Sequence, residues 1–410
     1  MRLHINLHGR FAAFPRPFWL LIAGTFIYLV GYDTGYPYET IYLHHTLGLS
    51  LTTIGLMLGL PLYAGLPMMV IGGALADRYG RLPVLRLGIC ASATLFAGLA
   101  LVSQLWQVVA LIAFEAACGW TMFQTANNAM VADLTPPQRR ARAYSLSRVA
   151  VSCGMVVGPF CGSLLLRLGA GFRTLFVCGS ALCLVFLVFS LLAFSETRPT
   201  PIAGAGTGSG WAGYRLVLAD RRFLSLCAVT ALPLYGFGQL WVTFPIALHE
   251  RLGISPASWG LLITLYALVI VVLQYPLVRR LERYDKTILM AAGSACVGLG
   301  MGGATLLARS WPVVCFMLLV SLGVILLIPI SATVVSEMAP VTSRGRYMGA
   351  WTLAWTAGTA LGPTVGGPVM DLLGVRGAYL LVLACGLAGS GLFLVRGRLL
   401  ATPAVTHPSS

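Results

Sequence analysis

Charged side chains are scarce in this 410-residue sequence, and lysine is almost absent from it. Asp, Glu, Lys and Arg make up 10% of the residues, and Lys286 is the one lysine. Soluble globular domains carry about 25% charged residues, so this composition excludes a water-soluble fold. Hydrophobic residues make up 58% of the chain. Because backbone polar groups inside lipid must pair within their own segment, the sequence predicts an all-α integral membrane protein.

The sequence also lacks the short motifs that bind nucleotides, metals or acyl groups. It contains no C-x-x-C pair, no H-E-x-x-H, no P-loop lysine motif and no G-x-S-x-G elbow. Its ten cysteines all fall in apolar stretches, where they are expected to pack as small buried residues without disulfides. We therefore expect no enzyme activity, no cofactor and no metal site. The net charge of +15 comes from basic residues scattered between apolar stretches, so no nucleic-acid partner is expected.

Twelve apolar stretches are long enough to cross the hydrocarbon core, which takes about 20 residues. They lie near residues 17–44, 50–76, 84–103, 107–133, 143–166, 174–195, 222–248, 257–278, 287–307, 312–337, 347–371 and 377–395. Lys and Arg gather on the segments at one side, and the other side holds only Arg167, Arg173, Arg251, Arg309 and Arg376. The positive-inside rule then predicts a multi-pass protein of the inner membrane with both termini in the cytoplasm.

The two halves of the sequence repeat each other. The pattern Gly154-x-x-x-Gly158-Pro159-x-x-Gly162 returns 204 residues later as Gly358-x-x-x-Gly362-Pro363-x-x-Gly366, and the same offset carries Asp133 to Glu337 and Arg140 to Arg344. A parallel repeat is typical of transporters whose halves are related by an axis along the membrane normal. We expect six-helix bundles at 1–196 and 221–410, joined by a Pro- and Gly-rich cytoplasmic linker at 197–220, in a monomer surrounded by lipid.

Two acidic residues fall in the middle of predicted spans. Asp33 lies in the span at 17–44, and Glu115 lies in the span at 107–133. An ionised acid there costs roughly 2.5–3.5 kcal/mol, so it is expected to face a wet cavity, find a partner or take up a proton. An acid that is buried in one conformation and hydrated in another can carry a proton between them, although a static hydrogen-bonded acid is the alternative for both. Glu39 lies nearer the outer interface, where a solvated carboxylate is expected.

Charged residues also gather where predicted spans end on the cytoplasmic side. The second span closes with Gly73-Ala74-Leu75-Ala76-Asp77-Arg78-Tyr79-Gly80-Arg81, and a partial copy containing Glu282 and Arg283 occurs 205 residues later. Asp133 closes the fourth span and is followed by Arg140 and Arg142. Carboxylates and guanidinium groups at neighbouring helix ends can pair across two helices. The candidate gating residues are Asp77, Arg78, Gly80, Arg81, Asp133, Arg140, Arg142, Glu282 and Arg283.

Over essentially its whole length, the chain resembles a twelve-helix transporter of the major facilitator superfamily, and in particular the drug:proton antiporters. The motif at 73–81 matches the family's loop between helices 2 and 3, with Leu82 in place of a basic residue. The pattern at 154–162 resembles the antiporter signature, with Ser163 in place of its last glycine. The resemblance implies the major facilitator fold, a cytoplasmic latch and proton-driven export. The chain departs from the family where Glu115 replaces an arginine four residues before Gly119, so we expect an acid to couple protons here.

The expected substrate region lies at mid-depth between the two halves. Aromatic and amide side chains are the candidates there: Tyr32, Tyr36, Gln124, Asn127, Tyr235, Gln239, Trp241, Tyr266, Gln274 and Trp355. The sequence thus predicts a proton-coupled exporter of small amphiphilic compounds that works by alternating access, and multidrug efflux is the expected role. Uptake of a sugar or other metabolite by proton symport or facilitation is one alternative. A non-transporting membrane receptor with the same fold is the other.

Overall fold

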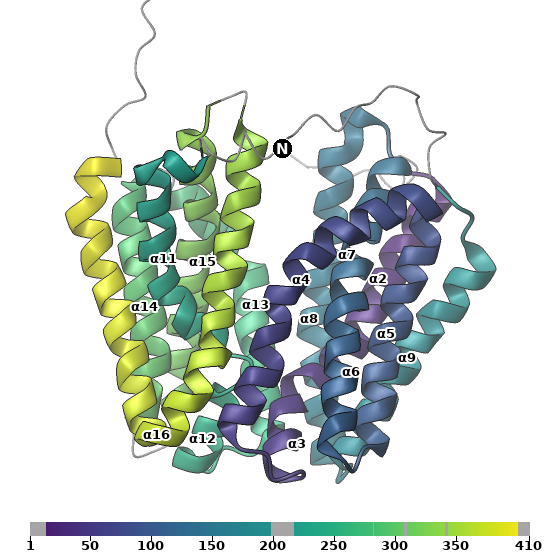
Figure 1. The fold of residues 1–410 in the computed structure, drawn as a ribbon, viewed down its shortest axis with the longest axis horizontal. Helices are drawn as coiled ribbons and strands as arrows, with labels where there is room; N and C mark the ends of the chain where they lie inside the picture. The colour runs from purple at the N-terminus through teal and green to yellow at the C-terminus, as the bar shows by residue number, and fades with distance from the viewer. Residues whose placement is uncertain (1–13, 198–216, 282, 307–309, 341–342, 401–410) are drawn as a thin grey trace, which may run out of the picture. The chain divides into compact units, whose positions relative to one another are not determined.

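The computed structural model describes residues 14–197, 217–281, 283–306, 310–340 and 343–400 (Figure 1). Its regular elements are all helical within these ranges. Most of the linker predicted at 197–220 lies outside them, as does the predicted gating residue Glu282. The described part of the linker includes residues 217–219, which are helical, and Asp220, whose carboxylate accepts hydrogen bonds from the first backbone N–H groups of the next helix.

The chain forms two compact units. Unit 1 consists of Met1–Pro37 and Ala64–Ala203, and unit 2 consists of Tyr38–Tyr63 and Gly204–Ser410. The boundaries fall in the short 3-10 helix η1 (Tyr36–Tyr38) and in the middle of helix α4 (Leu51–Tyr79). Unit 2 therefore contains a piece of chain from the first sequence half: helix α3 (Glu39–His45) and the first part of α4.

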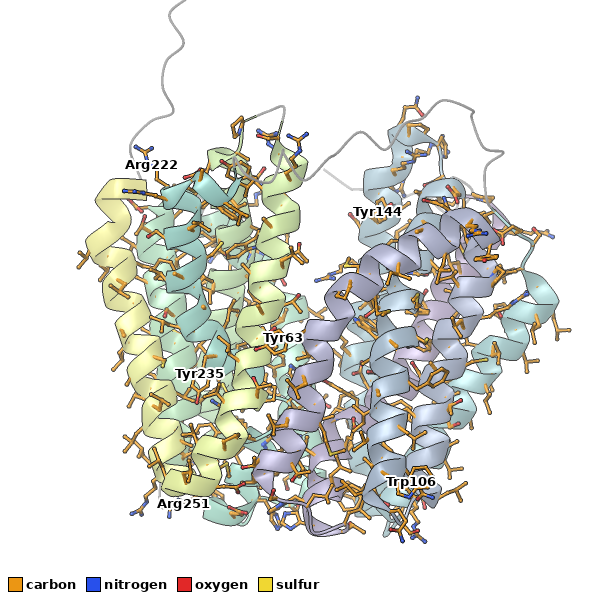
Figure 2. All side chains as sticks on the ribbon, viewed as in Figure 1. Tyr63, Trp106, Tyr144, Arg222, Tyr235 and Arg251 are labelled. Atoms are coloured by element: carbon orange, nitrogen blue, oxygen red, sulfur yellow. The ribbon has the colours of Figure 1, made fainter. Side chains whose placement is uncertain are left out.

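Unit 1 is built from long apolar helices that pack around an aromatic core. They are α2 (Arg16–Gly35), the second part of α4, α5 (Arg81–Leu101), α6 (Leu105–Cys118), α7 (Trp120–Asp133), α8 (Arg140–Arg167) and α9 (Phe172–Ala193), with the 3-10 helix η2 (Pro137–Arg139) before α8. Phe18, Tyr28, Phe123 and Phe186 are fully buried and fill the centre of this unit. Figure 2 places Trp106, near the start of α6, and Tyr144, near the start of α8, at opposite ends of the unit.

Unit 2 repeats this construction with helices from the second half. They are α11 (Arg221–Gln239), α12 (Phe244–Leu252), α13 (Pro256–Leu281), α14 (Lys286–Leu306), α15 (Val313–Met338) and α16 (Arg344–Leu400), which is interrupted at Gly374. Helices α11, α14, α15 and α16 lie side by side in Figure 1. Arg222 and Arg251 lie at opposite ends of the unit in Figure 2, so α11 and α12 together traverse it. The end that carries Arg251 is called the α12 end below.

The expected helical membrane fold is confirmed. Among the described residues, nine helices are long and apolar enough to cross a membrane, or ten when the bent pair α11 and α12 counts as one span. The 29-residue α4 adds one span to these ten, and α16 adds another if it is counted as two helices that meet at Gly374. The total among the described residues is then twelve. This count is consistent with the twelve predicted spans.

The first part of α4 is held inside unit 2 by close packing and by a carboxylate. A Cβ atom on Gly55 would lie 2.2 Å from Pro363 O, and one on Gly59 would lie 2.5 Å from the Thr364 methyl group. Asp371 Oδ2 accepts two hydrogen bonds from Thr52, from the backbone N at 2.8 Å and from Oγ1 at 2.6 Å. A carboxylate at a helix N-terminus pairs with backbone donors that would otherwise have no partner, and the helix dipole stabilises it there.

Candidate functional site

Asp33 lies near the end of α2, where that helix packs against α8. Its side chain is buried, and Oδ2 has no hydrogen-bond partner among the described residues. Gly158 of α8 faces it: a Cβ atom there would lie 2.6 Å from Asp33 Cβ and 3.0 Å from Val30 O. Thr34 Oγ1 donates to Val30 O at 2.6 Å and also lies 3.3 Å from Gly158 O. The glycine therefore lets α8 lie directly against the turn that carries the acid.

Another glycine of the pattern on α8, Gly154, lies at the same contact between α8 and α2. A Cβ atom on Gly154 would lie 2.3 Å from Leu29 Cβ, one turn before Asp33 on α2. Pro159 lies inside α8, and Gly162 lies one turn further along the helix. Substituting either Gly154 or Gly158 with a larger residue would push the two helices apart, because the nearest atoms belong to the backbone or to Cβ groups.

Glu115 is buried at the break between α6 and α7 and is fully engaged in hydrogen bonds. Ser92 Oγ lies 3.1 Å from Oε1 and 3.0 Å from Oε2, and the Trp120 backbone N–H donates to Oε1 at 3.0 Å. The Tyr28 hydroxyl lies 2.8 Å from Ser92 Oγ. The carboxylate also folds over Gly119, where a Cβ atom would lie 1.9 Å from Oε2. Glu115 therefore accepts a hydrogen bond from the backbone N–H of Trp120, the first residue of α7. Through Ser92 on α5 and Tyr28 on α2, it also connects these two helices to the break between α6 and α7.

The predicted substrate residues of unit 1 lie on α2, η1 and α7. Tyr32 contacts Tyr36, Phe96 and Trp120, with ring centroids 5.3, 5.4 and 5.9 Å away. Asn127 is buried and its Oδ1 accepts from Thr25 Oγ1 at 3.0 Å. Gln124 is half-buried on α7. These side chains offer aromatic faces beside amide groups, a combination that suits amphiphilic ligands.

The charged loop motif forms an ion-pair group at the end of unit 1 opposite Trp106. Arg81 pairs with Asp77 on α4, and its Nε lies 3.2 Å from Asp133 Oδ2 on α7. Arg81 and Asp133 are 13% and 12% exposed, whereas Asp77 is 72% exposed. The first pair is therefore screened by solvent, and the second contributes more because it is partly buried. The structure thus joins three of the predicted gating residues.

Gly80 starts α5 in a backbone conformation that other residues rarely adopt. Its φ is 109°, and a Cβ atom on it would lie 2.3 Å from Glu196 Oε2. Glu196 follows α9 and accepts hydrogen bonds from the backbone N–H groups of Arg81 at 2.8 Å and Leu82 at 3.1 Å. The sequence analysis missed Glu196 because the residue lies 115 positions away from Arg81 and no local pattern marks it. It is a further member of the motif.

The other predicted gating residues of unit 1 make separate contacts. Arg140 Nε donates to Ala132 O at 3.3 Å, the Arg142 guanidinium lies 5.7 Å from the Phe14 ring centroid, and that of Arg78 lies 5.3 Å from the Tyr79 centroid. Arg140 therefore binds a carbonyl at the end of α7, whereas the Asp133 carboxylate on the same helix pairs with Arg81.

Unit 2 repeats three of these contacts. Lys286 pairs with Glu337 as Arg81 does with Asp133. Arg344 Nε donates to Ser336 O at 3.1 Å, and the Arg283 guanidinium lies 5.2 Å from the Tyr284 centroid. Asp285 stands in place of the glycine and accepts from the Thr287 N–H at 2.7 Å. Both units therefore have an ion pair at this end. In unit 1 the helix that follows, α5, is capped by Glu196, which comes after α9. In unit 2 the helix that follows, α14, is capped by the neighbouring Asp285.

The repeated glycine pattern on α16 packs against α11 in unit 2. A Cβ atom on Gly362 would lie 2.6 Å from the Gly238 carbonyl carbon, one on Gly366 would lie 2.7 Å from Gln239 Cδ, and one on Gly358 would lie 3.0 Å from Leu234 Cδ1. Gln239 is fully buried and its Oε1 accepts from Thr243 Oγ1 at 2.9 Å. Gly366 of α16 in unit 2 therefore faces the buried amide of Gln239, whereas Gly158 of α8 in unit 1 faces the acid Asp33.

The predicted substrate residues of unit 2 lie in several places. Tyr235 and Tyr266 are buried, and Tyr235 is labelled in Figure 2. The ring of Tyr266 contacts Trp241 with centroids 6.2 Å apart, and Trp355 contacts Phe237 with centroids 5.9 Å apart. Gln274 is exposed on α13, so it does not join the buried members.

The prediction that Glu39 is solvated is wrong. Glu39 is the first residue of α3, it is 2% exposed, and its Oε1 has no hydrogen-bond partner among the described residues. Its place near the end of a predicted span suggested access to water. The sequence did not reveal that α3 packs against α12, and this packing belongs to the fold of unit 2.

Comparisons with known proteins agree with the arrangement described above. The sequence model of the Major Facilitator Superfamily matches residues 21–240 and 226–408. The multidrug resistance protein MdtH of Aeromonas hydrophila is 32% identical over 376 residues, which cover 88% of this chain and 89% of that protein. The MFS-type transporter YqjV of Bacillus subtilis is 26% identical over 380 residues, with 91% of each chain covered.

Solved structures share the fold at low sequence identity. A POT family transporter in complex with 5-aminolevulinic acid has a TM-score of 0.78 and 14% identity, with 95% of this chain and 97% of that chain covered. The nucleoside transporter NupG has a TM-score of 0.75 and 14% identity, with 95% and 100% covered. Both the family model and a relative of 32% identity span most of the sequence. The chain therefore belongs to the Major Facilitator Superfamily, a family of multi-pass membrane transporters.

Proposed function

We propose that the protein is a proton-coupled antiporter of the inner membrane that exports small amphiphilic compounds from the cytoplasm. The observation that carries this proposal is the buried Asp33, whose Oδ2 has no partner among the described residues and whose helix turn lies against Gly158. A buried carboxylate without a counter-ion is stable only when it is protonated or hydrated. A change in the α2–α8 contact changes its access to water, so the same group can bind a proton in one conformation and release it in another.

Asp33 and Glu115 have different roles in this proposal. Asp33 takes up the transported proton, because a carboxylate oxygen without a partner has little to hold it in the ionised form. Glu115 accepts from Ser92 and from the Trp120 N–H, and these donors stabilise its ionised form. Glu115 is then a positioning residue, which fixes the break between α6 and α7 beside the aromatic side chains of the substrate region.

Multidrug export is the substrate class that the relatives support. The MdtH proteins of Aeromonas hydrophila and Photorhabdus laumondii are named multidrug resistance proteins and are 32% and 30% identical to this chain. The aromatic group around Tyr32 offers flat apolar faces, which suit lipophilic cations and other amphiphiles. One pH unit supplies about 1.4 kcal/mol for each proton, which is enough for a tenfold gradient of a neutral substrate.

In the orientation proposed from the positive-inside rule, the ends that carry Arg81 and Lys286 lie in the cytoplasm. The ion pairs of Arg81 with Asp133 and of Lys286 with Glu337 then act as cytoplasmic latches. Each pair joins two helices that have to separate locally when the cytoplasmic side opens. Breaking them favours entry of substrate from the cytoplasm.

The test is an efflux assay with ethidium and acriflavine in cells that lack their own pumps. Cells that make the protein should retain less dye than control cells, and an uncoupler should abolish the difference. The Asp33→Asn variant should retain dye as the control cells do. Asp285→Asn is the matched control, because asparagine also caps a helix N-terminus, and it should export like the wild type. Dye export that persists with the uncoupler, or proton-driven uptake instead of export, contradicts the proposal.

A further inference from the structure

The turns that follow α3 and α12 share one hydrogen-bond pattern. His44 Nδ1 lies 2.8 Å from Leu49 O, and His249 Nδ1 lies 2.9 Å from Ile254 O. A carbonyl oxygen can only accept a hydrogen bond, so each Nδ1 must carry a hydrogen. The pattern is part of the sequence repeat, since His249 follows His44 by 205 residues. In each turn the ring is fixed by its own chain, and only its second nitrogen is free to bind elsewhere.

The second nitrogen of His44 binds an acid on another helix. His44 Nε2 lies 3.2 Å from Glu250 Oε1, which belongs to α12. A neutral imidazole has a single N–H, and Nδ1 of His44 already uses it. The hydrogen between Nε2 and Oε1 is therefore an additional proton, carried either by the imidazole or by the carboxyl group. The contact of α3 with α12 is made with one bound proton.

The repeat supplies a comparison within the same unit. The offset that relates His44 to His249 relates His45 to Glu250, so the counterpart of the His44–Glu250 pair is the pair of His249 and His45. These two rings have centroids 4.6 Å apart and are steeply inclined to each other, with 69° between their planes. Two imidazoles attract each other only while one of them is neutral, so this second pair gains nothing from a second proton. Only the His44 pair is strengthened by protonation.

We propose that His44 and Glu250 form a second proton-binding site, in which one bound proton clasps α3 to α12 and keeps the α12 end of unit 2 closed. This rests on the proposed function and orientation, in which the α12 end faces the outside. In a proton-driven exporter the outer side is open when substrate leaves and protons enter. A proton that closes this end after entry favours the return to the form that opens to the cytoplasm.

The surroundings allow the pair to sense external pH. The His44 and Glu250 side chains are 23% and 37% exposed, so water reaches both. The nearest other titratable groups are His45, on the same helix with a ring centroid 5.0 Å from His44, and His249 on α12. Arg251 follows Glu250 on α12, and Asp371 on α16 is held by Thr52. Helices α13 and α14, which also pack against α12, carry their charged residues Arg279, Arg280 and Lys286 at their opposite ends.

The sign of the pH effect follows from these groups. The His44–Glu250 contact holds one proton more than a separate neutral imidazole and carboxylate, so lower pH should strengthen the contact by mass action. An exposed pair of this kind changes an equilibrium by about threefold. The His45–His249 pair opposes closure only if both rings carry a charge, because like charges repel.

The experiment is hydrogen exchange of the full-length protein in lipid nanodiscs, without a gradient or substrate. Exchange of the peptides that cover α3 and α12 is compared at about pH 8 and about pH 6, after correction for the intrinsic exchange rate. The wild type should open about threefold less often at the lower pH. His44→Gln should abolish this difference, because glutamine takes up no proton. Glu250→Gln should abolish it as well.

His45→Gln is the matched control, because it removes a neighbouring imidazole but leaves the clasp in place, and it should keep the difference between the two pH values. The proposal is overturned if wild-type exchange is the same at both pH values, or if His44→Gln keeps the pH difference. Expression and size-exclusion profiles equal to the wild type establish that each variant is folded. The exchange experiment uses no proton gradient and no substrate. Its result can therefore be interpreted even if the dye-export assay fails.

Discussion

Replacing Gly158 with alanine tests the link between the antiporter-type pattern and the acid. The new methyl group would lie 2.6 Å from Asp33 Cβ, 2.9 Å from Asp33 C and 3.0 Å from Val30 O. Carbon atoms in contact are normally about 3.5–4.0 Å apart, so α2 and α8 must move apart by roughly 1 Å. Overpacking of this kind costs about 1–3 kcal/mol, and the helix preference of alanine returns about 1 kcal/mol. We expect a net loss of about 1 kcal/mol and weaker proton coupling.

The assay combines thermal unfolding with proton-driven dye export. Gly391→Ala on α16 is the matched control, because its new methyl group would have no heavy atom of another described residue within 4 Å and the gain in helix preference is the same. Gly158→Ala should melt at a lower temperature than Gly391→Ala and should export less dye for each proton that is taken up. The reasoning is refuted if Gly158→Ala melts and exports like Gly391→Ala, since the contact with Asp33 would then be unimportant.

Three further changes test other contacts. Glu196→Gln removes the charge at the start of α5 and should lower unit 1 stability by about 1 kcal/mol, measured by thermal unfolding, and an unchanged midpoint would contradict the capping role. Glu115→Gln should destabilise the break at Gly119 by about 1–3 kcal/mol while dye export still depends on the proton gradient, and loss of that dependence would make Glu115 a coupling residue. Asp371→Ala should raise hydrogen exchange in the first turn of α4, and unchanged exchange would show that the Thr52 contact is not stabilising.

The fold can be predicted from two features of the sequence, its long apolar runs and its internal repeat. The predicted spans are apolar runs of the length that a membrane requires, and the repeat of Gly154 and Gly158 as Gly358 and Gly362 is visible as a fixed offset. The structure then explains why these glycines recur, since each set lies where two helices of one unit touch. Asp33 is recognisable as a candidate for a similar reason, because an acid in a long apolar run is rare in any sequence.

Other parts of the site depend on contacts between distant residues and could not be predicted. Glu196 reaches the start of α5 from the end of α9, and its own sequence neighbourhood contains nothing that indicates this partner. Glu39 is buried at the start of α3, and α3 packs against α12, which lies some 200 residues later in the chain. The single-sequence pattern also does not reveal that Tyr38–Tyr63 groups with the second unit, since this depends on the packing of Gly55 and Gly59 against α16.

The most direct test of the account is to measure transport by purified Asp33→Asn protein in proteoliposomes under two driving forces. With an imposed pH gradient, the wild type should accumulate ethidium and the variant should not, because asparagine cannot carry a proton. In counterflow without a pH gradient, the variant should still exchange labelled for unlabelled dye, since substrate binding and the conformational change remain. If Asp33→Asn accumulates dye under the pH gradient as the wild type does, Asp33 does not couple protons and the central claim is contradicted.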